Sequence, residues 1–273
     1  MTIALPATTT TRSDLAGRGR HAGFRQAVRA EWTKLVTLRS TKWTLAVAAA
    51  GALFVTYLSV HGALHQPRGW YQDFDPTNQA LAGLAVGILA FGVLGALAVT
   101  GEYGTGTIRS SLAAMPRRDT LLAAKVTVVG LLTLVVGEIV SFGTFLFGQA
   151  VLSNGGAPTA ALDQPGVVRA VALSGATLAL FALLGLGLGT IIRHTAGGIA
   201  AFAAVTLLPP LLFSKISEHL MRFAPADMFA NSIATVVPGH DNYFSPTTSF
   251  LLLGAYVLAT LGVGAVVLIR RDA

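Results

Sequence analysis

A polar, glycine-containing stretch between two long apolar runs raises the question of nucleotide chemistry. It reads GEYGTGTIRSSLAAMPRR and covers residues Gly101–Arg118. A nucleotide-binding P-loop needs the pattern G-x-x-x-x-G-K-[ST], in which the lysine reaches the phosphates. No lysine follows these glycines until Lys125, and the dinucleotide pattern G-x-G-x-x-G is also missing. The sequence therefore predicts that the chain has no ATPase site of its own and is not an enzyme.

The same stretch predicts a short helix at Ile108–Ala114, capped by Thr107 and ended by Pro116. Its spacing places three residues on one face, namely Ile108, Ser111 and Leu112. Arg109 points elsewhere. A solvated turn is the alternative, but a simple turn needs only about two to eight residues. Because apolar side chains gain nothing in water, we interpret the helix as a docking element.

Glu138 is an ionisable residue in the middle of an apolar run. Such residues are costly in a membrane and are functional hypotheses by default. Two interpretations stay open. Glu138 could face a translocation path and meet a cation or a proton, or it could be a neutral carboxyl group bonded to a neighbour such as Ser141.

Four potential metal ligands lie close together before and within one loop, namely His61, His65, Asp73 and Asp75. A metal site needs converging nitrogen and oxygen ligands, which a H-x-x-x-H pair on a helix would provide. Gly62 and Pro67 weaken a helix there. We therefore expect no metal site, and no Ser-His-Asp order suggests hydrolysis.

Composition places these residues in a membrane protein. Hydrophobic residues make up 53% of the 273 residues and charged residues only 11%, whereas soluble domains carry about 25% charged residues. About 20 apolar residues span a hydrocarbon core, and the runs lack the alternation of a barrel. We therefore predict an all-α membrane protein with six spans. The predicted spans are Trp43–Val60, Ala80–Thr100, Val126–Leu152, Ala170–Ile192, Thr195–Ser214 and Ser249–Ile269.

The distribution of charge predicts the orientation. If the N-terminus is cytosolic, 15 of the 19 Lys and Arg residues fall on the cytosolic side. This is the positive-inside pattern, and it predicts a multi-pass protein of the cell membrane with both termini in the cytosol. The net charge of +7 then reflects topology and attraction to anionic membrane lipid rather than nucleic-acid binding.

The residues before the first span divide into a tail and a helix. Residues 1–20 are rich in Thr, Arg and Gly and predict a disordered basic tail. Residues 21–42 predict an amphipathic helix on the cytosolic surface, and residues 43–271 form the six-span domain. The apolar stripe of this helix comprises Phe24, Val28, Trp32, Leu35 and Leu38. Glu31 falls near its middle, where it pairs with a basic residue of the same helix or contacts a partner protein.

Helix ends and close contacts can also be predicted. Asp119 is the expected N-cap of a long third helix over Thr120–Leu152. The segment Lys215–Thr248 predicts one or two short outer helices, with Pro225 at a helix start and Pro238–Gly239 at a stop. Small residues four apart allow helices to approach closely, as at Gly83/Gly87 and Gly185/Gly189.

Three features resemble the membrane subunit of bacterial ATP-binding-cassette exporters of the type-two permease class. The first is RAEWTKLVTLRS, residues Arg29–Ser40, which is similar to that family's helix before the first span. The second is E-x-x-x-G-T-I-R-x-x-L-x-x-x-P-x-R, from Glu102 to Arg118, with Lys125 seven residues on. It is similar to the family's loop between spans two and three. The third is the six-span layout with a helical outer segment.

The resemblance implies that the loop forms a coupling helix held in a groove of a separate ATPase. The implied coupling residues are Glu102, Thr107, Ile108, Arg109, Leu112 and Arg118, together with Glu31 and Lys34 of the preceding helix. It also implies two ATPase chains that bind ATP and Mg, a second identical or homologous permease chain, and export of a lipophilic or amphiphilic cargo. This chain itself would bind no cofactor. The alternative is a stand-alone membrane enzyme or assembly factor without an ATPase.

Overall fold

The computed structural model describes residues 23–67, 74–115, 117–235 and 244–270. The predicted tail at residues 1–20, together with Asp73, Pro116 and Pro238–Gly239, lies outside this range. Within it the chain is helical and contains no strand. The helices are α1 (Phe24–Thr37), α2 (Arg39–Leu64), α3 (Pro76–Leu81), α4 (Leu84–Gly104), α5 (Thr107–Ala114), α6 (Arg118–Asn154), α7 (Val167–Ile192), α8 (Thr195–Ile216), α9 (Glu218–Met221), α10 (Pro225–Ile233) and α11 (Pro246–Arg270).

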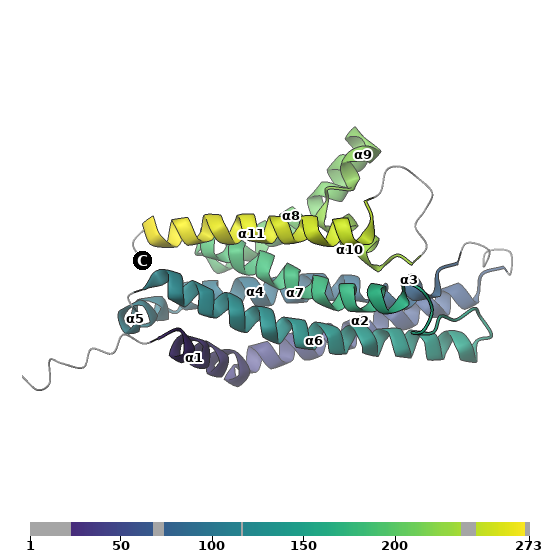
Figure 1. Ribbon diagram of the computed structural model, residues 1–273, viewed down its shortest axis with the longest axis horizontal. Helices are drawn as coiled ribbons and strands as arrows, with labels where there is room; N and C mark the ends of the chain where they lie inside the picture. The colour runs from purple at the N-terminus through teal and green to yellow at the C-terminus, as the bar shows by residue number, and fades with distance from the viewer. Residues whose placement is uncertain (1–22, 68–73, 116, 236–243, 271–273) are drawn as a thin grey trace, which may run out of the picture.

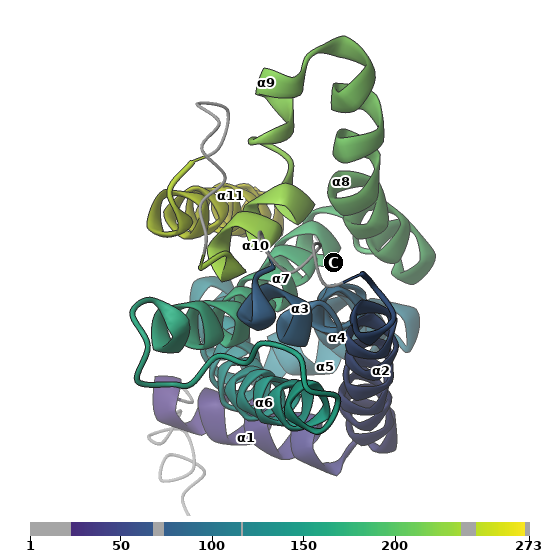
Figure 2. The ribbon, with the colours of Figure 1, turned by 90° about the vertical axis from the view of Figure 1, so that its right-hand side faces the viewer.

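Six helices are long and apolar enough to cross a membrane: α2, α4, α6, α7, α8 and α11. They coincide with the six predicted spans, so the all-helical, six-span fold is confirmed. The short helices α1 and α5 lie at one end of the bundle, and α3, α9 and α10 lie at the other (Figure 1). Viewed along the bundle, α4 and α7 are surrounded by α2, α6, α8 and α11 (Figure 2).

The central pair α4 and α7 approaches so closely because glycine lines the contact. A Cβ atom on Gly185 would overlap the carbonyl oxygen of Gly92, and one on Gly95 would overlap that of Ala182. Gly83 in the same way meets the backbone of Ala52 in α2. The prediction that small residues pack these helices is confirmed, and the close approach gives dispersion contacts over a long interface.

Two predicted helix caps are wrong. The N-cap of α5 is Gly106, whose φ of 71° lies in the left-handed region that glycine adopts without strain. Thr107 is the first helical residue, and its hydroxyl group pairs with that of Thr105 at 2.9 Å. The N-cap of α6 is Arg117, so Asp119 lies in the first turn, where a carboxylate is still favourable. The third span is therefore 37 residues long.

The amphipathic helix before the first span is shorter than predicted and buries a different face. It ends at Thr37, because Leu38 is extended, and residues 39–42 already belong to α2. The buried positions are Ala27, Glu31 and Leu35, since this stripe packs against α6. The predicted stripe is wrong in part, because three of its members are exposed: Phe24, Trp32 and Leu38.

The segment between the last two spans forms two short helices, as expected, and α10 is docked into the bundle. Pro225 is the first residue of α10, in agreement with the predicted start. Met228, Phe229 and Ile233 are buried against the neighbouring helices. Asp75 holds the residues that follow α10, because its Oδ2 accepts hydrogen bonds from the amide (3.0 Å) and the hydroxyl group (2.6 Å) of Thr235.

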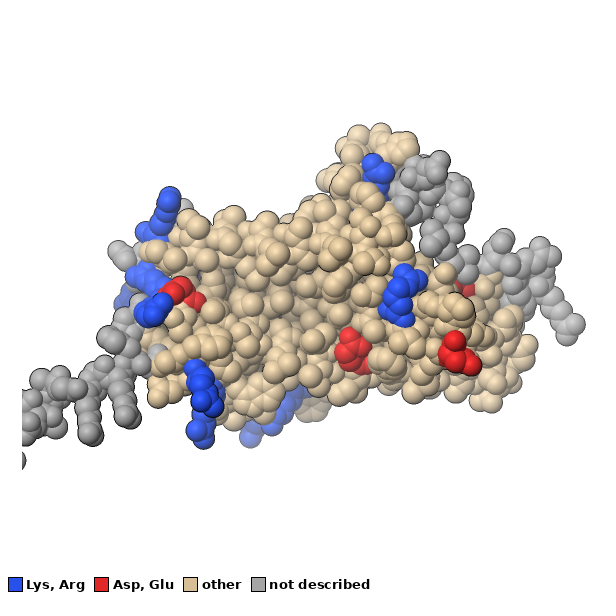
Figure 3. All heavy atoms as spheres, in the orientation of Figure 1, with Lys and Arg blue, Asp and Glu red and all other residues tan. Residues whose placement is uncertain are grey.

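Positive charge gathers at the end of the bundle that carries α1 and α5 (Figure 3). The exposed cationic residues at this end are Arg25, Arg29, Lys34, Arg39, Lys42, Arg109, Arg117 and Arg270. The opposite end carries a mixture of acidic and basic side chains in the same view. The two ends of the bundle therefore differ in net charge, and we call the end with α1 and α5 the charged end.

A single methyl group at the α4–α7 contact is expected to destabilise the fold. Replacing Gly with Ala inside an exposed helix normally stabilises by about 1 kcal/mol. At Gly185 the added Cβ atom meets the Gly92 backbone, so Gly185→Ala is expected to cost about 1–3 kcal/mol instead. Gly254→Ala in α11 is the matched control, because its Cβ atom would meet nothing within 4 Å. Thermal unfolding in detergent distinguishes them, and equal melting temperatures would contradict the packing described.

Candidate functional site

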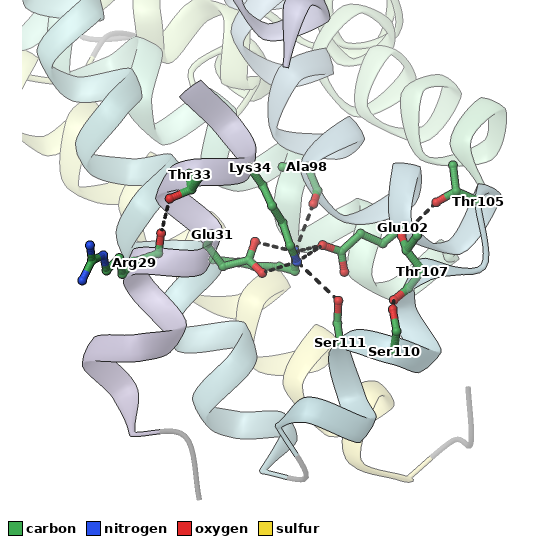
Figure 4. A network of polar contacts seen from close by, with 11 residues as sticks. Arg29, Glu31, Thr33, Lys34, Ala98, Glu102, Thr105, Thr107, Ser110 and Ser111 are labelled. Carbon is green, nitrogen blue, oxygen red and sulfur yellow. Dashed lines mark hydrogen bonds and ion pairs between the residues drawn. The ribbon is translucent and has the colours of Figure 1, made fainter. Parts of the chain in front are cut away.

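Four charged side chains from three helices meet at the charged end of the bundle. Figure 4 shows Glu31, Lys34 and Glu102 of this group pointing toward one another. Lys125 of α6 contacts Glu31 of α1 at 2.7 Å and Glu102 of α4 at 2.6 Å. Lys34 of α1 contacts the same two carboxylates at 2.9 Å each. We call these four residues the charge cluster. Its two positive and two negative charges sum to zero.

The charge cluster is unusual because half of it is shielded from water. The side chains of Lys125 and Glu31 are only 4% and 5% exposed. Burying an unpaired charge costs several kcal/mol, so buried charges persist where partners and hydrogen bonds compensate them. Each carboxylate here has two ammonium partners, and the Lys125 ammonium also reaches the Ala98 carbonyl at 3.4 Å. The cluster therefore fixes α1, α4 and α6 relative to one another.

Lys34 connects this charge cluster to α5. Its side chain is 43% exposed, and its ammonium donates to the Ser111 hydroxyl group at 3.3 Å. Burial lowers the pKa of Lys34, but the hydrogen bonds and the charges of Glu31 and Glu102 outweigh this effect, so its pKa lies above 10.5. Lys34 therefore stays charged at physiological pH, and α5 is joined to the cluster through one hydroxyl group.

The apolar face of α5 packs against its own chain. Ile108 is 5% exposed and lies in a small cluster with Ala27 of α1 and Leu121 of α6. Leu112 packs partly against the same cluster. The face that we expected to dock on a partner thus holds α5 on the bundle. The surface of α5 left for a partner consists of exposed residues, namely Thr107, Arg109, Ser110, Ala113 and Ala114.

Two arginines near this site hold the end of the last span. Arg118 of α6 donates to the Leu268 carbonyl at 2.8 Å, and Arg193 donates to the Val267 carbonyl at 2.8 Å. Arg193 also lies 5.5 Å from the ring centre of Tyr103. Because the last carbonyls of a helix lack intrahelical partners, both contacts stabilise the end of α11. Arg118 is therefore already engaged within its own chain.

Sequence reasoning missed the role of Arg193 and the central place of Lys125. A basic pair in a short turn is an ordinary anchor, and nothing in the sequence connects Arg193 with a helix 74 residues away. For Glu31, the pairing with a basic residue of its own helix is confirmed through Lys34. The additional bridge to Lys125 spans 94 residues and depends on how α1 crosses α6.

Glu138 lies in the middle of α6 and contacts α7 at Gly175. A Cβ atom on Gly175 would fall 2.7 Å from the Glu138 carboxyl carbon, so the absence of a side chain at Gly175 gives the carboxyl group its space. Of the two interpretations left open, the one with a bond to a neighbour such as Ser141 is not what is found at Ser141, because the Ser141 hydroxyl group donates to the Val171 carbonyl at 2.7 Å. Within the described part of the chain, no hydrogen bond to the Glu138 carboxyl is formed.

The two histidines at the end of α2, His61 and His65, contact each other edge to face. His61 and His65 have ring centres 4.7 Å apart, and the Nδ1 atom of His65 pairs with the His61 carbonyl at 2.8 Å. Asp75 is engaged with α3 and Thr235. Over residues 23–67, 74–115, 117–235 and 244–270, no group of three potential ligands could hold a metal ion.

These observations define a helical, multi-pass membrane protein with a short helix held by a charge cluster at its charged end. The family model described as "ABC-2 family transporter protein" matches residues 24–273, so the chain belongs to the ABC-2 transporter family. It is accordingly a permease, and the family implies an ABC ATPase as its partner. No individual curated protein is significantly similar to the chain.

Removing the central ammonium of the charge cluster is expected to destabilise the chain strongly. Lys125→Met leaves Glu31 and Glu102 facing each other with only Lys34 between them. Breaking a buried pair from one side typically costs about 3–5 kcal/mol. Lys42→Met, at an exposed position of α2, should stay within about 0.5 kcal/mol. Thermal unfolding in detergent gives both values.

A second substitution tests the cause. Adding Glu102→Gln to Lys125→Met removes one of the stranded carboxylates, so the double variant should unfold at a higher temperature than Lys125→Met alone. If Lys125→Met were as mild as Lys42→Met, the charge cluster would not hold these helices together.

Proposed function

We propose that this permease exports a lipophilic or amphiphilic molecule and is driven by a separate ATPase that binds α5. One observation carries the proposal: α5 is connected through Ser111 and Lys34 to a buried charge cluster that joins three other helices. A force on α5 would therefore act on α1, α4 and α6 together rather than on a loose loop. ATP and Mg would be bound by the ATPase, and this chain would supply no cofactor site.

The charged end of the bundle is proposed to be cytosolic. Its exposed Lys and Arg residues fit the positive-inside rule and attraction to anionic lipid headgroups (Figure 3). This orientation brings α1, α5 and the last turn of α11 to the side on which ATP is available. This orientation supports a contact between α5 and an ATPase on the cytosolic side of the cell membrane.

The working unit is proposed to contain two permease chains and two ATPase chains. Cargo would cross between the permease chains, and closure of the ATPases would change the side of the membrane to which that path opens. The resemblance of the Glu102–Arg118 loop to exporters of this class supports export. No nucleic acid is expected as a partner, because the positive charge is placed for membrane topology.

Arg109→Asp is expected to release the ATPase. Arg109 is exposed on α5 and carries no part of the apolar contact that holds α5 in place. Its guanidinium group suits a carboxylate-rich groove, because it can pair in bidentate fashion. The recovery of an ATPase in a mild-detergent pull-down from native membranes should fall at least about tenfold, which corresponds to about 1.4 kcal/mol.

The matched control is Lys215→Asp, which makes the same change of charge at an exposed position of the opposite end. It should leave recovery of the ATPase unchanged. Leu112→Asp is a poorer test, because Leu112 packs against the chain itself and its loss would also loosen α5. A folded chain that purifies without any ATPase would instead favour the alternative of a stand-alone membrane enzyme or assembly factor.

Glu138→Gln is expected to change transport without changing assembly. The carboxyl group lies in the middle of a span without a hydrogen-bonding partner among the described residues, so its conversion to an amide removes only a charge or a proton. Transport of candidate cargoes into inverted vesicles should change in rate, while the amount of ATPase recovered stays the same. Unchanged transport of every cargo tried would show that Glu138 is not on the path.

A further inference from the structure

A cavity of about 720 Å³ lies directly beside the charge cluster. Four elements form its walls: α1, the first turns of α2, the last turns of α4, and α5. Cavities of about 300–1,000 Å³ are typical of sites for drug-sized ligands. Nothing in the proposed coupling of α5 to an ATPase requires a space of this size.

The cavity has an apolar part and a polar part, and α4 contributes to both. Leu94, Leu97 and Ala98 line it towards the middle of the span, and Glu102 and Thr105 line it near the end of α4. Leu94 and Thr105 are separated by about 16 Å along the helix, at 1.5 Å per residue. A molecule that fills this space must therefore have an apolar part and a polar part.

The polar part of the cavity presents hydroxyl groups and balanced charge. Its hydroxyl-bearing wall comprises Ser40, Thr41 and Thr44 of α2 and Thr107, Ser110 and Ser111 of α5. The charged residues on the wall are Glu31, Glu102 and Lys34, and Lys125 directly behind them completes the neutral cluster. A ligand with a net charge would lose hydration there without meeting an uncompensated opposite charge.

One carboxylate oxygen beside the cavity lacks a donor. Glu102 uses its Oε1 for both lysines, whereas its Oε2 is buried without a hydrogen-bond partner within the described residues. A buried acceptor of this kind lowers stability. This oxygen is closed off from the cavity and sets no preference for a ligand, whereas a ligand hydroxyl group can bond to the Ser and Thr side chains of the wall.

We infer that this cavity binds an amphiphile with an uncharged, polyhydroxylated head group. The apolar part lies along Leu94 and Leu97, and the head group lies among Glu102, Thr107 and Ser110. The cavity would be the site at which cargo is loaded from the cytosolic leaflet of the membrane. This part of the inference rests on the proposed function. Because α5 forms part of the wall, occupancy of the cavity and the position of α5 are linked.

The test uses the full chain in lipid nanodiscs and a dodecyl maltoside that carries a photoreactive diazirine in its alkyl chain. Cross-linked peptides should come from the first turns of α2 and the last turns of α4. Leu97→Trp fills the cavity and should lower this labelling about tenfold, equivalent to about 1.4 kcal/mol. Thr44→Phe fills the cavity from the facing wall and should lower the labelling by a similar factor. Because two different substitutions are used, a folding defect in one of them does not decide the result. Leu131→Trp, on an exposed part of α6, is the matched control and should leave labelling unchanged.

Competition identifies the recognised chemistry. Unlabelled dodecyl maltoside should compete, free maltose should not, and dodecyl sulfate should compete about tenfold more weakly. Equal competition by dodecyl sulfate would show that the alkyl chain alone is recognised. Labelling that neither cavity variant reduces would show that the site is elsewhere. Either result overturns the inference.

This result is separable from that of the ATPase pull-down. Labelling of the cavity needs no ATPase, so a chain that binds the probe but recovers no ATPase would keep the cavity and lose the proposed coupling. A chain that recovers an ATPase but is not labelled in the cavity would keep the coupling and lose the amphiphile site.

Discussion

Two carboxylates and two ammonium groups meet in a space from which most water is excluded, and the arrangement of the charged end depends on them. If Lys125 moved away from Glu31, each of these two buried groups would lose one of its two oppositely charged partners, which is costly in a medium of low polarity. The helices α1, α4 and α6 must therefore keep their relative positions or move together. A short helix connected to such a unit is well placed to transmit a force, and α5 is connected to it through Lys34 and by the packing of Ile108.

The central helices complete this mechanical picture. The glycines of α4 and α7 bring the two backbones into direct contact, so these helices form a common core. Arg118 and Arg193 connect the end of α11 to the same region. Motion that begins at α5 can thus reach both the first half of the bundle, through the charge cluster, and the last span, through Arg118.

The elements of the fold could be predicted from the sequence because each rests on a local property. Runs of apolar residues revealed all six spans, and Pro225 marked the start of α10. Caps were less predictable, because Gly106 in a left-handed conformation competes with Thr107 for the same role. The buried face of α1 was also misjudged, because burial there follows contact with α6 and not hydrophobicity alone.

The candidate site was predictable only as a set of residues. Glu31, Lys34 and Glu102 were expected to take part in coupling to an ATPase, and the structure brings them together within the chain. Lys125 pairs with Glu31 and Glu102, which lie 94 and 23 residues away from it in the sequence, and no local pattern reveals these pairs. Arg109 is the charged residue of the expected set that remains exposed on α5.

The most direct test of the account is site-specific cross-linking from α5. The chain contains no cysteine, so Ala113→Cys introduces a single thiol on the exposed surface of α5 that a thiol-reactive photo-cross-linker can modify. Irradiation in native membranes should join this position to a polypeptide that contains a Walker motif, whereas the same label on Leu220→Cys at the opposite end should not. Cross-links from α5 only to lipid or to other membrane chains would contradict the claim that an ATPase holds this helix.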